Sequence, residues 1–326
     1  GSIDPNILLN LLAMQRKINI EDGDFHIQGL ENADLPFMNV KLDFIEKSKS
    51  DYSLIARGSV AAAVPTEFNF GMNYLGDLNE PSNALIDFEL KTSNVKINEL
   101  VNFVPALKLD LFAGGFKDLD IMGTIQNGTL RSVKSNFYID KIMLGKETII
   151  SSGEGKFEYK PLKNKHILSM NNLKVHNQKL FSNPITISSA RGDIISDYIE
   201  QKWTISTENF ETKVSDINLK TNAKLQIDAN KVSNFELTSK LSNSAIEKAL
   251  SLLPDNLMPM DLNRWLKKSL QDGFVDQVKI NYLDQKLLTA INFRRMTLAY
   301  TPGWPSIHDI DAVMTVNPHE ISIESQ

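Results

Sequence analysis

The sequence predicts a mainly β protein: an elongated, curved antiparallel meander that forms a trough with an apolar concave face, plus a few short helices. Two observations predict the mainly β class and the antiparallel meander. Apolar and polar residues alternate with a period of two over most of the chain, and turn-forming residues separate the alternating segments. Such alternation places one face of each strand in an apolar environment and the other in water. Strands of a parallel sheet covered on both faces would instead read as continuous apolar runs.

The chain opens with segments that precede the alternating pattern. Residues 1–2, Gly-Ser, are interpreted as a tag-cleavage scar, and Asp4-Pro5 predicts a short helix within residues 3–16, with proline at its first position. An antiparallel β-groove array is then expected over residues 17–240. Residues 21–24 (Glu-Asp-Gly-Asp) are interpreted as a solvated hairpin turn in it, because they lack the ligand spacing of a calcium-binding EF-hand loop.

Several segments within this array alternate clearly, and Asn127-Gly128, the preferred pair for a tight hairpin, separates two of them. Apolar residues on the strand faces are candidates for lining a groove. The candidates sampled along the chain, including one from the C-terminal segment, are Val40, Leu42, Phe44, Phe68, Phe70, Met72, Ile86, Phe88, Leu90, Met122, Phe137, Leu225, Ile227 and Phe293.

A helical insertion is predicted over residues 241–273. Ser244 and Glu247 have the spacing of a capping box at the start of one helix. A second helix is expected to begin at Asp261, to direct Leu262, Trp265 and Leu266 inward, and to end at Gly273. The groove strands then continue over residues 274–326, where the pattern stops in mid-alternation, as in a fragment of a longer protein.

Composition narrows the function classes. The net charge of −5 and the pI of about 5.6 argue against nucleic acid as a partner, because nucleic-acid binders usually present a basic face. The chain contains no cysteine, which excludes thiolate catalysis, disulfides and thiolate zinc sites. The longest apolar stretch, residues 7–14, is far shorter than the ~20 residues of a membrane-spanning helix.

No catalytic constellation is found in the sequence. The five histidines are scattered, and none has the spacing of a metal-binding pair on one helix face. There is no glycine-rich phosphate loop and no nucleophile elbow. Asp118 and Asp120 flank Leu119 and are interpreted as outward polar positions of a strand rather than a catalytic carboxylate pair. We therefore expect a protein that is not an enzyme and that uses no metal or cofactor.

Two basic pairs are candidate contacts for lipid phosphates, although solvated positions are the favoured interpretation. They are Lys267-Lys268 and Arg294-Arg295. Because adjacent strand residues point to opposite faces, one arginine of the second pair is expected on the apolar side of the sheet or at its rim.

The C-terminal part of the chain resembles the AsmA-like/YhdP family of bacterial envelope proteins. The resemblance covers residues 253–305 and rests on Leu253-Pro254, Trp265-Leu266-Lys267-Lys268-Ser269-Leu270, Gly273, Phe293-Arg294 and Leu298-Ala299-Tyr300-Thr301-Pro302-Gly303-Trp304-Pro305. Gln271-Asp272 departs from the family, which often has a second glycine there. Pro302, Gly303, Trp304 and Pro305 are interpreted as a structural type II turn, with Trp304 packing over the chain reversal.

The resemblance implies a function in lipid transport. Members of the family are similar to repeating β-groove bridges, in which a long sheet is bent into a trough with an apolar floor. Such a bridge is expected to carry phospholipid between the inner and outer membranes across the periplasm. It implies a location in the periplasm, with an inner-membrane anchor in the full-length protein that is absent from this membrane-proximal fragment. Phospholipid acyl chains, the two membranes and further envelope proteins are the expected partners.

Periodicity leaves two ways of covering the apolar face. A second sheet can pack on it and form a sandwich, or the face can stay open and hold lipid. A closed sandwich would favour the alternative function, a structural or chaperone-like β-scaffold for outer-membrane protein assembly. A glycan-processing enzyme is a third possibility, and it requires a carboxylate pair that converges in a cleft.

Overall fold

The computed structural model describes residues 15–325, except for a set of short internal segments. These segments are residues 31–32, 62–64, 98–111, 145–147, 162–164, 180, 200–201, 229–230, 243, 253–254, 258–259, 284–285, 302 and 317–320. The helix predicted within residues 3–16 lies outside the described residues.

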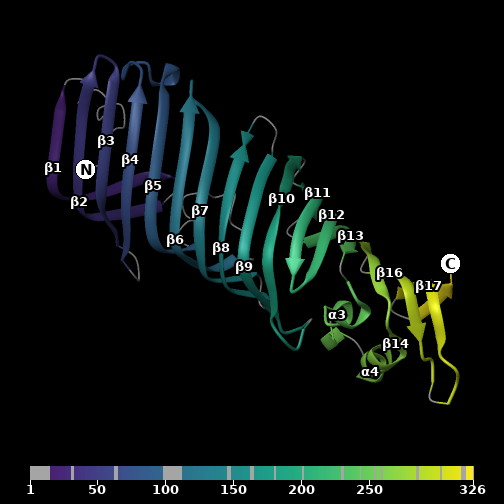
Figure 1. Cartoon of the computed structure of the whole chain (residues 1–326). Coiled ribbons are helices and arrows are strands. Elements are labelled where there is room, and N and C mark those ends of the chain that lie inside the picture. Colours follow the sequence, from purple (N-terminus) through teal and green to yellow (C-terminus); the bar gives the residue numbers. More distant parts are fainter. Residues whose placement is uncertain are drawn as a thin grey trace. The chain divides into compact units, whose positions relative to one another are not determined.

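The described strands form one open antiparallel sheet of 18 strands. The first eight are β1 (Lys17–Leu30), β2 (Ala33–Ser48), β3 (Asp51–Val60), β4 (Thr66–Leu75), β5 (Leu85–Lys96), β6 (Phe112–Gln126), β7 (Thr129–Leu144) and β8 (Thr148–Lys160). The others are β9 (Lys165–Asn177), β10 (Ile185–Ile199), β11 (Lys202–Val214), β12 (Ile217–Asp228), β13 (Lys231–Ser242), β14 (Leu270–Gln271), β15 (Phe274–Leu283), β16 (Lys286–Leu298), β17 (Ile307–Val316) and β18 (Ile321–Ser325). The predicted antiparallel β meander is confirmed (Figure 1).

The chain divides into two compact units. Unit 1 comprises residues 1–146 and 154–163, and unit 2 comprises residues 147–153 and 164–326. In unit 1 each strand from β1 to β7 pairs with the next one along the chain. In unit 2 the same rule holds from β9 to β13 and from β15 to β18, while β13 pairs with β15.

Short turns explain this order. Asn127 and Gly128 have φ angles of 52° and 67°, so both adopt the left-handed conformation of a two-residue hairpin between β6 and β7. Asparagine tolerates this conformation and glycine carries no β-carbon to oppose it. The hairpin predicted from this dipeptide is therefore confirmed.

Bulges interrupt the strands, and three of them are stabilised by the same kind of hydrogen bond. Asn39, Asn209 and Arg295 each have a positive φ inside a strand. In each case an Asp or Asn side chain on a neighbouring strand accepts a hydrogen bond from the backbone N–H of the bulged residue. The bonds are Asn39 N to Asp24 Oδ1 at 3.1 Å, Asn209 N to Asn222 Oδ1 at 2.7 Å, and Arg295 N to Asp311 Oδ1 at 2.9 Å.

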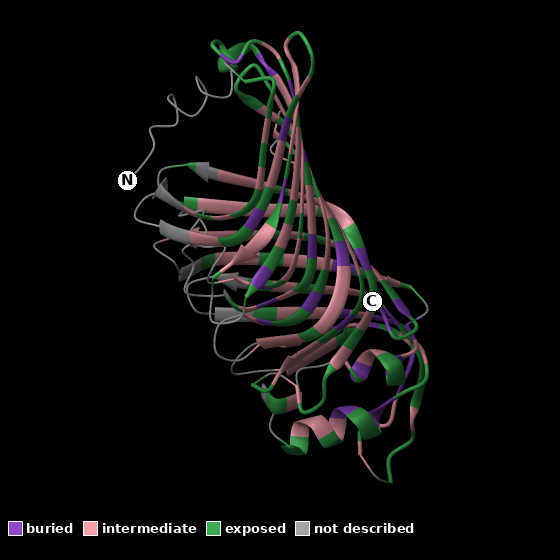
Figure 2. Cartoon of the chain, turned by 90° about the vertical axis from the view of Figure 1, so that its left-hand side faces the viewer, coloured by how far each residue is buried: buried purple, intermediate pink, exposed green. Residues whose placement is uncertain are grey.

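Each of these hydrogen bonds satisfies a backbone N–H that the bulge would otherwise leave without a partner. The bulges also bend the strands that carry them. The curvature of the strands along their length is visible in Figure 2. Asp24, predicted to lie in a hairpin turn with residues 21–23, instead lies inside β1, where it caps the bulge at Asn39. The turn prediction was wrong because the acidic run marks the polar side of an irregular strand.

Among the described residues, two α-helices and a 3-10 turn lie between β13 and β15. They are α3 (Ile246–Leu250), the 3-10 turn η4 (Asp255–Leu257) and α4 (Met260–Ser269). The predicted capping box is wrong: the N-cap of α3 is Ala245, without a side-chain hydrogen bond. Ser244 is buried, and its hydroxyl donates a hydrogen bond to the carbonyl oxygen of Val275 in β15.

Helix α4 directs its apolar side chains inward as predicted, with Leu266 buried and Leu262 and Trp265 packed against the same core. Its end differs from the prediction. The helix stops at Ser269, and Gly273 belongs to a tight turn between β14 and β15, where Asp272 and Gly273 have φ angles of 51° and 86°. The helix ends before Gly273 because Leu270 pairs with Leu298 of β16 and so belongs to strand β14.

Candidate functional site

The strands of unit 1 present one face that is predominantly apolar. Residues directly paired across an antiparallel sheet lie on the same face, so the register defines rows that cross the sheet. One row from β2 to β7 is Leu42, Ala56, Phe70, Leu90, Ile121 and Ser135, and the next is Phe44, Leu54, Met72, Phe88, Gly123 and Val133. Phe68 pairs with Thr92, which pairs with Leu119 and through it with Phe137.

These pairings bring most of the predicted candidates together. Val40 joins the same face across the bulge at Asn39, because one of its methyl groups lies beside Gly58, the partner of Phe68. Ile86 pairs with Tyr74 and lies in the same set. The unit 1 candidates on the apolar face are Val40, Leu42, Phe44, Phe68, Phe70, Met72, Ile86, Phe88, Leu90 and Phe137.

Met122 lies on the opposite face. It pairs with Glu89 on β5 and with Lys134 on β7, and 38% of its surface is exposed. The position opposite Phe88 on the apolar face is taken by Gly123. Ile121 and Met122 are adjacent apolar residues, so alternation alone did not show which one faces inward.

Glycines of the apolar face are covered by large neighbouring side chains. The ring of Phe88 lies over Gly123, the ring of Phe210 lies over Gly192 in unit 2, and Leu173 covers Gly153. A ring that lies over a glycine shields its backbone without projecting far from the sheet. At these positions the side chains of the apolar face therefore project only a short distance from the sheet.

One end of the apolar face in unit 1 is closed by the connection between β4 and β5. Leu78 and Ala84 from this connection are buried against Phe44 and Tyr74. The hydroxyl of Tyr74 donates a hydrogen bond of 2.8 Å to the carbonyl oxygen of Asp77, and burial raises the pKa of Tyr74. Beyond this cluster, no helix or second sheet packs over the face among the described elements of unit 1.

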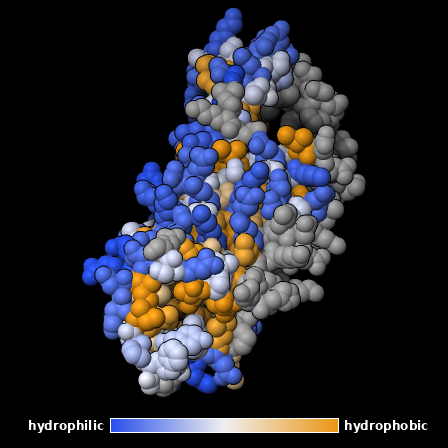
Figure 3. Space-filling model, turned by 90° about the vertical axis from the view of Figure 1, so that its right-hand side faces the viewer, coloured by the Kyte–Doolittle hydropathy of each residue, from blue (hydrophilic) through white to orange (hydrophobic). Residues whose placement is uncertain are grey.

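Unit 2 has an apolar face built in the same way. Leu225 on β12 pairs with Ile205 on β11 and with Phe235 on β13. Ile227 lies two residues further along β12 and pairs with Trp203. Both predicted candidates on β12 therefore lie on one face, beside the apolar side chains of Ile205, Phe235 and Trp203. Figure 3 shows hydrophobic surface gathered in the lower part of the side that it views, with hydrophilic surface to its left.

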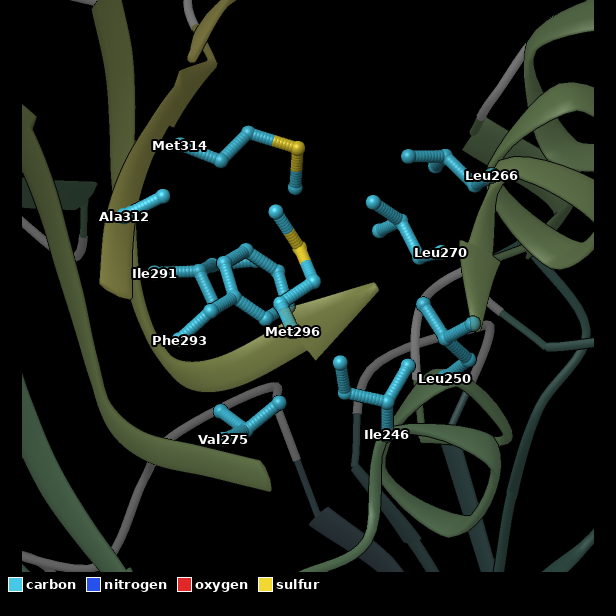
Figure 4. Packing of buried hydrophobic residues seen from close by; sticks show 10 residues of the cluster. All are labelled: Ile246, Leu250, Leu266, Leu270, Val275, Ile291, Phe293, Met296, Ala312 and Met314. Atoms are coloured by element: carbon cyan, nitrogen blue, oxygen red, sulfur yellow. The ribbon is translucent and has the colours of Figure 1, made fainter. Parts of the chain in front are cut away.

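Phe293, the last candidate, is 4% exposed and lies in a closed core rather than on an open surface. Helices α3 and α4 pack on the apolar side of β15–β17 and cover it there. Figure 4 shows side chains of the two helices facing those of the strands around Met296. The members of this core are Ile246, Leu250, Leu266, Leu270, Val275, Ile291, Phe293, Met296, Ala312 and Met314.

The polar face of unit 1 carries a shallow hollow of ≈ 610 Å³. Gly71 forms its floor, and Ile55, Glu89 and Met122 lie in the same cross-strand row. This hollow is on the side of the sheet opposite the apolar rows, and we assign it no part in the candidate site. Among the described residues, no group of three or more His, Asp or Glu side chains is placed to hold a metal ion.

Comparison with protein families identifies the chain. The family model described as YhdP protein matches residues 80–326. The chain belongs to the YhdP family. The match extends from the 3-10 turn η1 (Pro81–Asn83) and β5 to the last described strand, and so includes β5–β8 and all of unit 2. No curated protein and no solved structure matched the chain.

Membership of the YhdP family confirms the resemblance that the C-terminal motifs suggested. This is a bacterial envelope family, and membership is consistent with lipid transport in the envelope. The family is not known for enzymatic activity. None of the described helices is both long and apolar enough to cross a membrane.

The YhdP family turn around Gly303 has the predicted backbone. Gly303 has a φ of 87°, and the N–H of Trp304 donates to the carbonyl oxygen of Thr301 at 3.2 Å, as in a type II turn. Pro302 lies outside the described residues, and Pro305 is exposed. Trp304 is 72% exposed and so does not pack over the reversal. Trp265 of α4 takes that place: its indole N–H donates to the carbonyl oxygen of Tyr300 at 3.1 Å.

Both arginines of the pair 294–295 are exposed, which differs from the prediction. The bulge at Arg295 breaks the alternation, so Phe293 and Met296 face the core while both arginines face outward. Arg294 forms an ion pair of 2.9 Å with Asp276, and Arg295 forms one of 3.1 Å with Asp309. The bond with Asp276 raises the pKa of Arg294. Neither guanidinium is needed to explain the apolar face.

Proposed function

We propose that this chain carries phospholipid acyl chains on its apolar sheet face, as part of a protein that moves phospholipid between the inner and outer membranes across the periplasm. The observation that carries the proposal is the set of apolar rows from β2 to β7, which no second layer covers among the described elements of unit 1. Membership of the YhdP family supports the same function.

The energetics of such a surface suit a lipid. Burying apolar area contributes ~0.8 kcal/mol per CH₂ group, so a sixteen-carbon chain gains roughly 12 kcal/mol relative to water when it is fully covered. This attraction has no directional requirement, so binding needs no converging polar groups. Because Gly123 and Gly192 carry no side chain, the rings of Phe88 and Phe210 lie close to the sheet. This leaves room for an acyl chain on the apolar face.

The remaining parts of the proposal concern location and partners. The full-length protein would be anchored in the inner membrane and would lie in the periplasm. Its apolar face would take acyl chains from one membrane and deliver them to the other, with further envelope proteins at its ends. The apolar face of unit 1 is the observation in favour of acyl chains as the cargo. Family membership is the observation in favour of the proposed location.

The proposal is tested by native mass spectrometry of the purified chain, with solvent extraction and identification of the bound lipid. Phe70→Asp places a carboxylate in an apolar row between Ala56 and Leu90. Asn69→Asp, the adjacent residue, places the same group on the polar face between Arg57 and Lys91. We expect co-purified phospholipid in the unmodified chain and in Asn69→Asp, and its loss in Phe70→Asp.

Thermal unfolding of both variants separates lost binding from lost folding. A folded, monodisperse chain that carries no lipid and takes up none from phospholipid vesicles would contradict the proposal. That result would favour a scaffold that binds protein partners through the same strands.

A further inference from the structure

The apolar face of unit 2 is divided along the strands into a covered part and an open part. One row of register partners runs through Ser239, Val278, Ile291 and Met314, of which Ser239 and Ile291 are 5% exposed and Met314 is 1% exposed. The next row, two residues further along each strand, runs through Leu237, Ile280 and Thr289, and none of these is buried. The boundary therefore falls between two adjacent rows.

The covered part is closed by the segment 244–269, which contains α3, η4 and α4. Its side chains Ile246, Leu250 and Leu266 complete the core over β15–β17 (Figure 4). Met296, at the centre of this core, is 0% exposed. A ligand therefore cannot contact the buried core residues of β15–β17 beneath these helices, such as Ile291 and Met314.

Polar contacts hold the segment along the strand ends. Asp255 accepts hydrogen bonds from the backbone N–H of Ser182 at 3.0 Å and from the Ser182 hydroxyl, in the connection between β9 and β10. Asn256 donates to the carbonyl oxygen of Gln178 at 2.8 Å in the same connection. Lys248 forms an ion pair of 2.9 Å with Asp216, in the turn between β11 and β12.

These contacts place the segment beside two strand connections of unit 2, β9–β10 and β11–β12. The connection between β16 and β17 is joined as well, through the bond from Trp265 to Tyr300. The helical segment is therefore fastened along one margin of the apolar face, from β9–β10 to β16–β17, and not only over the core that it covers.

We infer that segment 244–269 is a side wall, and that acyl chains cross unit 2 in a lane formed by the two rows beside it. The first row of the lane is Thr207, Ala223, Leu237, Ile280 and Thr289, and the second contains Ile205, Leu225 and Phe235. This inference rests on the proposed function and adds the path that the cargo takes in this unit.

The chemistry and length of the lane fit an acyl chain. The described side chains of its rows are aliphatic, aromatic or threonine, without a formal charge. Strands lie ~4.8 Å apart, so a row across β11, β12, β13, β15 and β16 is about 19 Å long. Half of a bilayer core, which holds one acyl chain, is about 15 Å deep. One chain can therefore lie across the strands without entering the covered core.

The row at the foot of the wall is less suited to a chain. The hydroxyl groups of Thr221 and Ser239 hydrogen-bond to each other at 2.8 Å on the apolar side. An acyl chain over this pair would gain less than over Leu225 and Phe235, because hydroxyl groups offer little apolar area. Both the helices and this polar pair direct the chain towards the open rows.

The test uses the whole chain and vesicles of phosphatidylethanolamine that contain a phospholipid with a diazirine in one acyl chain. After irradiation, adducts are mapped by peptide mass spectrometry. We expect adducts on the lane, in peptides that contain Leu225 or Leu237, and on the apolar rows of β4 and β5 in unit 1. We expect none at Ile291, Met296 or Met314.

A pair of variants tests the lane directly. Leu237→Asp puts a charge in the lane, and Thr238→Asp puts the same charge on the opposite face, beside Asn222 and Lys279. We expect loss of the unit 2 adducts in Leu237→Asp with those of unit 1 retained, and no change in Thr238→Asp.

The outcomes separate the wall from the function as a whole. Adducts at Met296 or Met314 in the unmodified chain, together with adducts in unit 1, would overturn the side wall and leave the lipid function intact. Absence of adducts on both apolar faces would overturn the proposed function and the inference with it. Equal adducts in Leu237→Asp and Thr238→Asp would show that chains do not use the lane.

Discussion

The ring of Phe88 lies so close over Gly123 that a β-carbon added to the glycine would stand 2.4 Å from the ring. The two residues are register partners on β5 and β6. The carbonyl oxygen of Ser132 would be 3.1 Å from the same carbon. The apolar floor of unit 1 thus depends on the absence of a side chain at one position, and this relationship can be tested.

Gly123→Ala is expected to destabilise unit 1 by about 1–3 kcal/mol, because the Phe88 ring must leave its position over the strand. The free energy of unfolding from urea denaturation measures this effect. Gly71→Ala is the matched control: its added β-carbon meets nothing within 4 Å. There we expect a gain of about 0.5 kcal/mol, since alanine loses less backbone freedom on folding. Equal effects at both positions would contradict the close packing of Phe88.

Met296→Ala is expected to destabilise the chain by about 2–5 kcal/mol, because it leaves a cavity in the core between the helices and the strands. Met260→Ala removes the same side chain from the start of α4, where it is exposed, and is expected to change stability by less than ~0.5 kcal/mol. Chemical denaturation compares the two. A small effect at Met296 would mean that α3 and α4 do not seal this part of the sheet.

Asn222→Ala is expected to lower the free energy of unfolding by about 1 kcal/mol. It removes the acceptor of the Asn209 N–H at the bulge of β11. Lys220→Ala, on the same strand and face, removes an exposed ion pair with Glu211 and is expected to cost less than ~0.5 kcal/mol. If the two substitutions cost the same in urea denaturation, the side-chain cap does not stabilise the bulge.

The stability of unit 2 is expected to fall as the pH drops below the ordinary histidine pKa of 6.5. Burial lowers the pKa of His166, whose Nε2 lies 2.6 Å from the Ser196 hydroxyl. The unfolded chain therefore binds a proton at a higher pH than the folded chain does, and stability rises with pH through this range. The contribution is fully present above pH 6.5 and decreases below it.

Urea denaturation between pH 5 and pH 8 checks this expectation. His166→Gln keeps a hydrogen-bonding group on β9 but cannot take up a proton in this range. We expect its free energy of unfolding to change less between pH 7.5 and pH 5.5 than that of the unmodified chain. A pH dependence that is identical in both chains would assign the titration to other groups.

The local pattern was sufficient to predict the class of fold and much of the apolar face. Alternation over residues 67–74 and 86–90 assigns Phe70 and Phe88 to the same side of neighbouring strands, and the register confirms it. The left-handed turn at Asn127-Gly128 follows from backbone preferences of those two residues alone. These features depend on residues close together in the chain, so they can be read from its order.

The facing of residues around bulges could not be predicted in this way. At Asn39 the backbone turns left-handed because Asp24, 15 residues earlier, accepts its N–H. That bond places Phe37 against Phe68 on the apolar side, whereas Met38 pairs with Ser59 and is exposed. Strict alternation would instead put Met38 on the same side as Val40, two residues further along the strand. The same effect turns both Arg294 and Arg295 outward.

The sequence by itself determined an antiparallel β meander with one apolar face and membership of a family whose motif surrounds Gly303. Tertiary structure alone decided which part of that face is open. Phe70 and Phe293 both occupy apolar strand positions, yet only Phe293 lies beneath α3 and α4. Alternation predicts that a side chain is shielded from water, but it does not predict whether protein or a ligand shields it. The reason is that the covering group comes from a distant part of the chain or from another molecule.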